Sequence, residues 1–267
     1  MSFIDKNWKK MLNEKFKKKS GDEIWKKIRK DILDKFPDTQ FQPKEDDIFN
    51  VFKMHRSEIK VVILGQDPYP EPGKATGRAF AVPPEPEYKV VKRESLNVIK
   101  EEIKEEKKLP NRLNLDGEWQ TLEHWIERGV FLLNTALTVE KKDKNKAKSK
   151  NKEVPHLKFW EDFTNKVIEY ISENSKKYPC IWMLWGVKAK RFKGKISNGI
   201  PVDSRNIDKI LKEIREKRPI KDKNYILEAP HPSPKNGKKF YKSGRYNFLY
   251  ANEILKALLD EKEIIKW

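Results

Sequence analysis

The sequence predicts an α/β fold in which a parallel sheet is covered by helices on both faces. Four short runs are apolar at every position, and segments with helical periodicity separate them. Continuous apolar character, rather than alternation, is typical of strands buried on both faces of a parallel sheet. We expect the strands at residues 61–64, 130–133, 180–185 and 225–227.

Apolar residues recur at helical spacing between and around these runs. Amphipathic helices are expected at residues 95–108, 159–172 and 246–259, and residues 1–50 are expected to form an N-terminal helical segment. The length of 267 residues suits one large domain or two small ones, and no Gly/Ser-rich linker divides the chain.

The composition is that of a soluble protein, because 37% of the residues are charged and no apolar stretch approaches the roughly 20 residues of a membrane helix. The first residues lack the apolar core of a signal peptide. Cys180 is the only cysteine, which excludes an internal disulfide and fits a reducing compartment. We expect a buried, inert thiol in a cytoplasmic protein, or in a nuclear one if the source is eukaryotic or viral.

The charge balance favours a polyanionic partner. Lysine and arginine outnumber aspartate and glutamate by 59 to 41, a formal net charge of +18. Such an excess suits nucleic acid above all, although lysines that only solvate the surface would give the same count. Residues 141–152 hold seven lysines and one aspartate without a hydrophobic pattern, which predicts a Lys-rich loop.

Each predicted strand ends in a polar or turn-forming group. In chain order, these are Gln66 with Asp67, then Asn134, Gly186 and His231. Ligands of parallel α/β sheets bind outside the carboxyl ends of the strands. We therefore expect Gln66, Asp67, Asn134 and His231 to converge on one site, although they are dispersed in the sequence.

The converging side chains could hold a nucleobase and cleave its bond to the sugar. Asp67, stiffened by the proline that follows it, could orient or deprotonate water, or stabilise a developing cation. Asn134 offers a paired acceptor and donor, and His231 can donate a hydrogen bond to a leaving anion. Tyr69 and Phe80 could supply a wall and a stacking face. The spacing alone does not exclude a different small planar substrate.

Four motifs closely resemble those of family 1 uracil-DNA glycosylases and occur in the order of that family. They are Gly65-Gln66-Asp67-Pro68-Tyr69-Pro70, Leu132-Leu133-Asn134-Thr135-Ala136-Leu137-Thr138-Val139, Leu184-Trp185-Gly186 and Ala229-Pro230-His231-Pro232-Ser233-Pro234. Shorter matches occur at residues 77–82, 95–97 and 160–164 and at Trp267, so the resemblance spans roughly residues 55–267. The combined signal is highly specific.

The resemblance implies a single α/β domain over residues 1–267 with a four-stranded parallel sheet. It also implies hydrolysis of the N-glycosidic bond of deoxyuridine in single- or double-stranded DNA, which releases uracil and leaves an abasic site. The target nucleotide would be flipped out of the stack. Asp67 would position the attacking water and stabilise the oxocarbenium-like sugar, and His231 would bond the uracil oxygen that gains charge. No metal or cofactor is implied.

The same resemblance assigns residues to the base and to the DNA. Asn134 would read the uracil amide edge, and Tyr69 would crowd the position of the thymine methyl group. Phe80 would stack on the base, and Gln66 would line the pocket. Small groups and backbone amides allow a phosphate to approach closely. The residues expected at the DNA are Ser95, Gly186, Pro232, Ser233, Pro234 and Lys235.

Four positions depart from the family pattern. Pro70 stands where the family usually has histidine, and Glu140 stands where it has arginine. Lys235 replaces the usual leucine wedge that fills the gap left by a flipped base, and Asn236 replaces a serine. Because lysine cannot fill the stack as leucine does, we expect a stronger preference for single-stranded DNA than is usual in the family.

Two other classes of protein compete with a repair hydrolase. A non-catalytic DNA-binding relative would need only cations, so the presence of Asp67, Asn134 and His231 argues against it. A metallohydrolase is disfavoured because the four histidines have no paired ligand spacing. We expect a monomer without a membrane partner, and a proteinaceous glycosylase inhibitor is a candidate partner.

Overall fold

The central sheet of the protein has the strand order β3-β2-β5-β7-β6, and every neighbouring pair of strands is parallel. The computed structural model describes residues 8–9, 11, 30–35, 41–84, 94–106, 118–141, 156–173, 179–216, 223–233, 235, 240, 246–259 and 261–267. The strands of the sheet are β2 (Val61–Gly65), β3 (Val130–Asn134), β5 (Ile181–Trp185), β6 (Gly199–Val202) and β7 (Asn224–Ala229).

The sheet has five strands, so the prediction of four is wrong by one edge strand. The additional strand is β6, which pairs with β7 from Gly199 beside Asn224 to Val202 beside Leu227. Its sequence contains a glycine and a proline, and three of its four residues are not buried. Proline is tolerated in edge strands, where one side of the ladder stays unpaired. The apolar run that marked the other four strands is therefore missing here.

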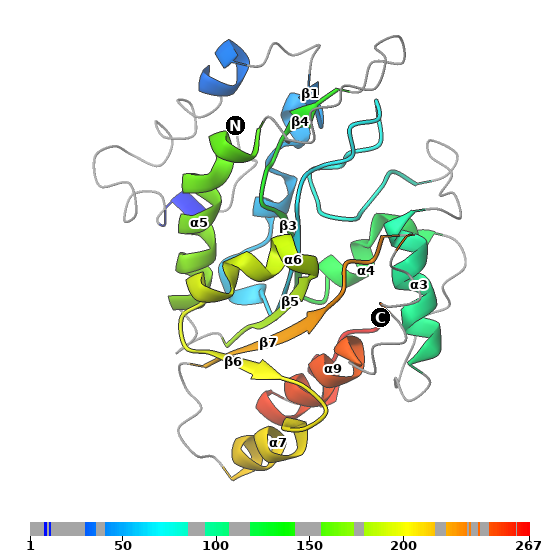
Figure 1. Ribbon diagram of the computed structural model, residues 1–267, viewed down its shortest axis with the longest axis vertical. Helices are drawn as coiled ribbons and strands as arrows, with labels where there is room; N and C mark the ends of the chain where they lie inside the picture. Colours follow the sequence, from blue (N-terminus) through cyan, green and yellow to red (C-terminus); the bar gives the residue numbers. More distant parts are fainter. Residues whose placement is uncertain are drawn as a thin grey trace.

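Helices cover both faces of the sheet. The α-helices are α3 (Ser95–Glu105), α4 (Glu123–Ile126), α5 (Leu157–Glu173), α6 (Gly186–Lys190), α7 (Ile207–Arg215) and α9 (Asn247–Leu258). Short 3-10 helices occur at Glu45–Asp47, Asn50–Lys53, Arg56–Glu58, Glu118–Thr121, Arg191–Lys195 and Glu261–Glu263. In Figure 1, α5 lies on one side of the sheet and α3 and α9 lie on the other.

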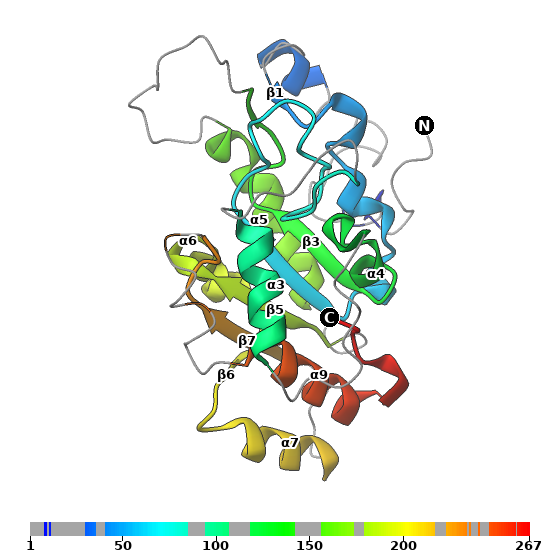
Figure 2. The ribbon, with the colours of Figure 1, turned by 90° about the vertical axis from the view of Figure 1, so that its right-hand side faces the viewer.

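The strands β2, β3, β5 and β7 contribute side chains to two hydrophobic cores, whereas β6 contributes to one. Val61 and Ile63 pack with residues of α3, α7 and α9, whereas Val62 and Leu64 pack with residues of α5. Figure 2 shows the sheet between these two layers. Burial of an aliphatic side chain stabilises the fold by about 1.5–3 kcal/mol, so both faces of the strand select apolar residues. This two-sided burial is the reason that the runs are apolar at every position.

The described N-terminal residues belong to the core around α5. Trp8 is fully buried, its Nε1 donates to the Met54 carbonyl oxygen at 2.8 Å, and its ring stacks on Phe131 at 5.3 Å between centroids. Residues 30–35 are helical, and β1 (Phe41–Gln42) pairs antiparallel with β4 (Val139–Glu140). Most of the predicted segment 1–50 before residue 41 lies outside the described residues.

The predicted Lys-rich loop 141–152 also lies outside the described residues, apart from the exposed Lys141. Among the helices that the structure describes, none combines the length and the apolar character that a membrane crossing requires.

Candidate functional site

The segments at the carboxyl ends of β2, β3 and β7 line one cavity of about 280 Å³. Asp67 comes from the loop after β2, Asn134 is the last residue of β3, and His231 follows β7. The side chains that the sequence predicts to converge therefore line a common cavity. Its lining consists of Gly65, Gln66, Asp67, Pro68, Tyr69, Pro70, Ala75, Arg78, Phe80, Ser95, Asn134 and His231.

Backbone hydrogen bonds hold the ends of β2 and β3 together at this cavity. The Thr135 amide donates to the Gly65 carbonyl at 3.0 Å, and the Ala136 amide donates to the Gln66 carbonyl at 2.8 Å. The Thr135 hydroxyl also donates to the Gln66 carbonyl at 3.0 Å. These bonds fix Asn134 directly beside the loop that carries Asp67.

Gly65 also lines the cavity, although the sequence marks it only as the first residue of a motif. It pairs with Asn134 in the sheet, and a Cβ atom at position 65 would lie 2.1 Å from Asn134 Oδ1 and 2.8 Å from Ala79 Cβ. A contact this short cannot persist, so only glycine lets the Asn134 carboxamide occupy its place in the cavity.

Phe80 and Tyr69 form the aromatic part of the lining. Phe80 has φ of +65°, a left-handed conformation that is strained for a bulky residue. Its ring centroid lies 5.6 Å from that of Trp185 and 6.4 Å from that of His231. The Tyr69 hydroxyl donates to the Phe80 carbonyl at 3.4 Å. The loop thus holds two flat faces on one cavity at the cost of local backbone strain.

A buried ion pair supports the Tyr69 ring. The Lys74 ammonium lies 4.0 Å from the ring centroid, and its Nζ is 3.1 Å from a carboxylate oxygen of Glu94. Both charged side chains are 7% exposed. Glu94 directly precedes Ser95, the first residue of α3, so the same contact ties Tyr69 to this end of the helix.

Burial shifts the pKa values of the two titratable groups that line the cavity beside the aromatic rings, Asp67 and His231. It raises the pKa of Asp67 from 3.8 to about 6, and the nearby Lys188 ammonium opposes this rise. Burial also lowers the pKa of His231 below 6.5, and Lys188 lowers it further. At pH 7 the imidazole is therefore neutral and the carboxylate is largely ionised.

A second cavity of about 280 Å³ adjoins the first, because Gln66 and His231 line both. Gly186 lies in its wall with φ of +84°, and a Cβ atom there would be 2.7 Å from His231 Cβ. Glycine is required at this position for its backbone conformation and for the close approach of His231.

The residues predicted to contact DNA do not all reach these cavities. Ser95 lines the first cavity and Gly186 lines the second. Pro232 is buried, Ser233 is half-buried and Lys235 is exposed, and none of the three lines either cavity. Pro234 and Asn236 lie outside the described residues.

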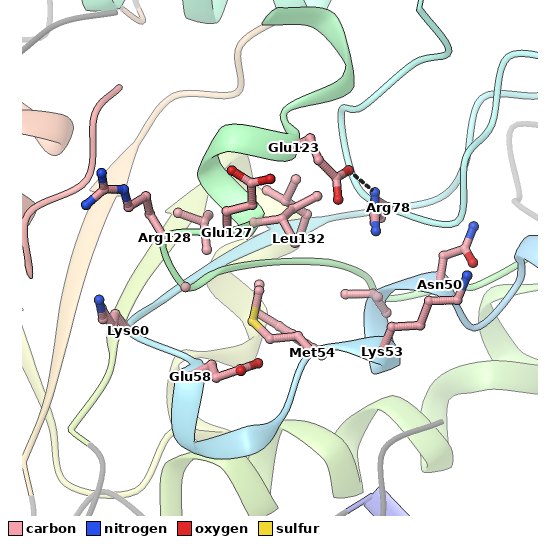
Figure 3. Close-up of a pocket in the computed structure, with 15 residues that line it drawn as sticks. Asn50, Lys53, Met54, Glu58, Lys60, Arg78, Glu123, Glu127, Arg128 and Leu132 are labelled. Atoms are coloured by element: carbon pink, nitrogen blue, oxygen red, sulfur yellow. Dashed lines mark hydrogen bonds and ion pairs between the residues drawn. The ribbon is translucent and has the colours of Figure 1, made fainter. Parts of the chain in front are cut away.

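A roomier cavity of about 500 Å³ lies at the β3 edge of the sheet and contains none of the predicted residues (Figure 3). Four basic and three acidic side chains line it, and Arg78 Nη1 is 2.6 Å from Glu123 Oε2. Arg78 also lines the first cavity. The mixture of charges gives this cavity no evident chemistry.

His55, His156 and Cys180 take structural positions. His55 caps a 3-10 helix, His156 Nδ1 lies 2.9 Å from the Thr138 hydroxyl, and Cys180 is fully buried, as the sequence predicts. Within the described part of the chain, no three His, Cys, Asp or Glu side chains are grouped so that they could hold a metal ion.

Comparison with known proteins identifies close relatives of this arrangement. Residues 52–256 match the model of the Uracil DNA glycosylase superfamily. The chain is 34% identical to the uracil-DNA glycosylase of Fusobacterium nucleatum, with 99% of this chain and 96% of the relative aligned. It is 33% identical to that of Clostridioides difficile, with the same coverage.

Solved structures show the same fold. A mimivirus UNG variant in complex with UGI superposes with a TM-score of 0.70 at 23% identity, covering 100% of this chain and 89% of the other. The UNG of Nitratifractor salsuginis gives a TM-score of 0.52 at 19% identity, covering 100% and 94%.

Proposed function

Because the chain belongs to the uracil-DNA glycosylase superfamily, we propose that it is a DNA-repair hydrolase that releases uracil from DNA. The observation that carries this proposal is the common cavity, in which a carboxylate, a carboxamide and an imidazole meet from three separate strands. Pure DNA binding requires cations and would not require this set. Membership of family 1 rests on the motifs and is part of the proposal.

In the proposed reaction, Asp67 acts on the sugar side of the bond. Its carboxylate orients the attacking water and stabilises the positive charge that develops on the sugar as the bond to N1 breaks. A pKa of about 6 leaves the group ionised at neutral pH while keeping it basic enough to accept a proton from the water.

His231 acts on the base side of the bond. As the bond breaks, its electron pair stays with uracil, and negative charge develops on the carbonyl oxygen of C2, the carbon next to N1. A neutral imidazole can donate a hydrogen bond to that oxygen without transferring its proton to it. The low pKa of His231, caused by burial and by Lys188, favours this neutral form.

The remaining lining selects the base. Asn134 pairs with the amide edge of uracil and rejects cytosine, whose amino group presents a donor where the carboxamide also offers one. Tyr69 excludes the thymine methyl group, and its ring is held by Lys74. Phe80 stacks on the base, and Gln66 completes the pocket.

The DNA itself is held outside the cavity. Ser95, Ser233 and the Gly186 amide contact phosphates, and Pro232, Pro234 and Lys235 form the segment that meets the strand. The net charge of +18 favours association with the backbone. In duplex DNA, an apolar residue at position 235 would act as a wedge that fills the gap left by the flipped base. Lys235 is exposed and cannot fill this gap, so uracil in single-stranded DNA is the preferred substrate.

One assay tests this function. The protein is incubated with uracil-containing DNA in excess chelator, and the DNA is then treated with alkali, which breaks the strand at abasic sites. Cleavage at uracil supports the proposal. Binding without cleavage would indicate a non-catalytic DNA-binding protein, and cleavage that is lost with chelator would indicate a metallohydrolase.

Addition of a proteinaceous glycosylase inhibitor to the same assay tests the proposed partner. We expect release to stop, because the structurally similar mimivirus variant is itself in complex with UGI. Release that continues at saturating inhibitor would contradict this.

A further inference from the structure

Lys188 lies between the two loops that carry the proposed reacting groups. It belongs to α6, directly after β5, and it lines the second cavity together with Gln66 and His231. In the sheet, β5 is flanked by β2 and β7, the strands that lead to Asp67 and His231. The sheet order therefore places the first turn of α6, which carries Lys188, between the two loops.

The charge of Lys188 is not offset by an ion pair within the described residues. Its neighbours Lys190 and Lys193 both contact Glu228, at 3.3 and 2.9 Å. Lys188 itself is exposed and forms no ion pair with any carboxylate of the described chain. The field of an ammonium group without a counter-ion reaches further than that of a paired one.

Two cations in the lining of the first cavity and beside Tyr69 are paired. Arg78, in the wall of the first cavity, contacts Glu123, and Lys74 above Tyr69 contacts Glu94. The ring that faces His231 is that of Phe80, whose centroid lies 6.4 Å from the imidazole and which carries no charge. Consistent with this, Lys188 is the charged group that acts on both Asp67 and His231 and lowers the pKa of each.

We propose that Lys188 is a positioning residue for uracil release, whose ammonium group keeps the Asp67 carboxylate ionised and the His231 imidazole neutral. Its importance for catalysis rests on the proposed function, whereas its electrostatic effect does not. Loss of the charge should make both groups bind protons more tightly, so the protein should need a higher pH to work.

Three variants separate this role from a structural one. Lys188→Gln removes the charge, and Lys188→Arg keeps it. Lys190→Gln is the matched control, because it removes an equal charge two residues away and leaves Glu228 paired with Lys193. The first measurement is an NMR titration of the His231 ring in the protein without DNA. The chain has four histidines, so a His231→Gln variant assigns the signal.

The second measurement is the pH profile of uracil release at two salt concentrations. We expect Lys188→Gln to raise both the His231 midpoint and the acidic limb of the rate profile by about 0.5 to 1 pH unit. Lys188→Arg and Lys190→Gln should stay close to wild type. At 0.5 M salt the difference should shrink, because mobile ions screen the exposed ammonium group.

The titration tests the role of Lys188, and the release assay tests the proposed function, so one can be refuted without the other. An unchanged His231 midpoint in Lys188→Gln, or an equal rise in Lys190→Gln, would overturn the role of Lys188 whatever the DNA assay shows. Absence of uracil release by the wild-type protein would overturn the proposed function, and the titration would still decide whether Lys188 acts on His231.

Discussion

Replacement of Asp67 by asparagine should make the protein more stable and less active at the same time. Burial raises the pKa of this carboxyl from 3.8 to about 6, which corresponds to roughly 3 kcal/mol of unfavourable free energy for the ionised form. The folded state holds the Asp67 proton more tightly than the unfolded state does. The protonated carboxyl group therefore makes its full contribution to the free energy of unfolding only below pH 3.8. That contribution is lost as the pH rises through about 6.

Asparagine cannot ionise, so Asp67→Asn removes this penalty. At pH 7.5 the free energy of unfolding should rise by up to about 3 kcal/mol, and at pH 5 the gain should be roughly half as large. Urea unfolding followed by tryptophan fluorescence measures both values. Asp162→Asn is the control, because Asp162 is 74% exposed and should change the stability by less than about 0.5 kcal/mol.

The same variant tests the role in catalysis. Uracil release should fall by about 10² to 10⁴, because the water loses the group that orients and deprotonates it. DNA affinity should stay close to wild type. In the wild-type protein, release should decline as the pH falls through about 6, where Asp67 takes up a proton. Near-normal turnover, or a variant no more stable than wild type at pH 7.5, would refute the reasoning from burial.

Three further substitutions test the cavity lining and the DNA contact. Gly65→Ala should lower uracil release by about 10²-fold, because the new Cβ atom would displace the Asn134 carboxamide. Gly194→Ala is the control and should leave uracil release unchanged, because a Cβ atom at that position would meet no other atom within 4 Å. Equal rates in both glycine variants would contradict this. Tyr69→Ala should gain release of thymine from DNA, measured as free base, and no gain would argue against the role of the ring. Lys235→Leu should increase release from duplex DNA relative to single strands, and an unchanged ratio would remove the proposed preference.

The sequence was sufficient to predict the layers of the fold and the convergence of the site. Strands buried on both faces leave continuous apolar runs, and the topology of a parallel sheet places their carboxyl ends together. The edge strand β6 escaped prediction because a half-exposed strand with a glycine and a proline has no such run. Helix α7 follows it and was missed with it.

Features that depend on close approach could not be predicted from residue types. Gly65 and Gly186 look like ordinary turn residues, yet each leaves room for a side chain that is distant in the sequence, Asn134 in one case and His231 in the other. The influence of Lys188 on two groups is likewise a consequence of strand order. Sequence patterns report local periodicity, whereas these contacts arise only when separate strands are adjacent.

The most direct test of the site is a crystal structure of the protein with free uracil. We expect the base in the first cavity, stacked on Phe80, with its amide edge hydrogen-bonded to Asn134 and the oxygen beside N1 hydrogen-bonded to His231. Uracil bound elsewhere, or bound there without contact to Asn134 and His231, would contradict the proposed site.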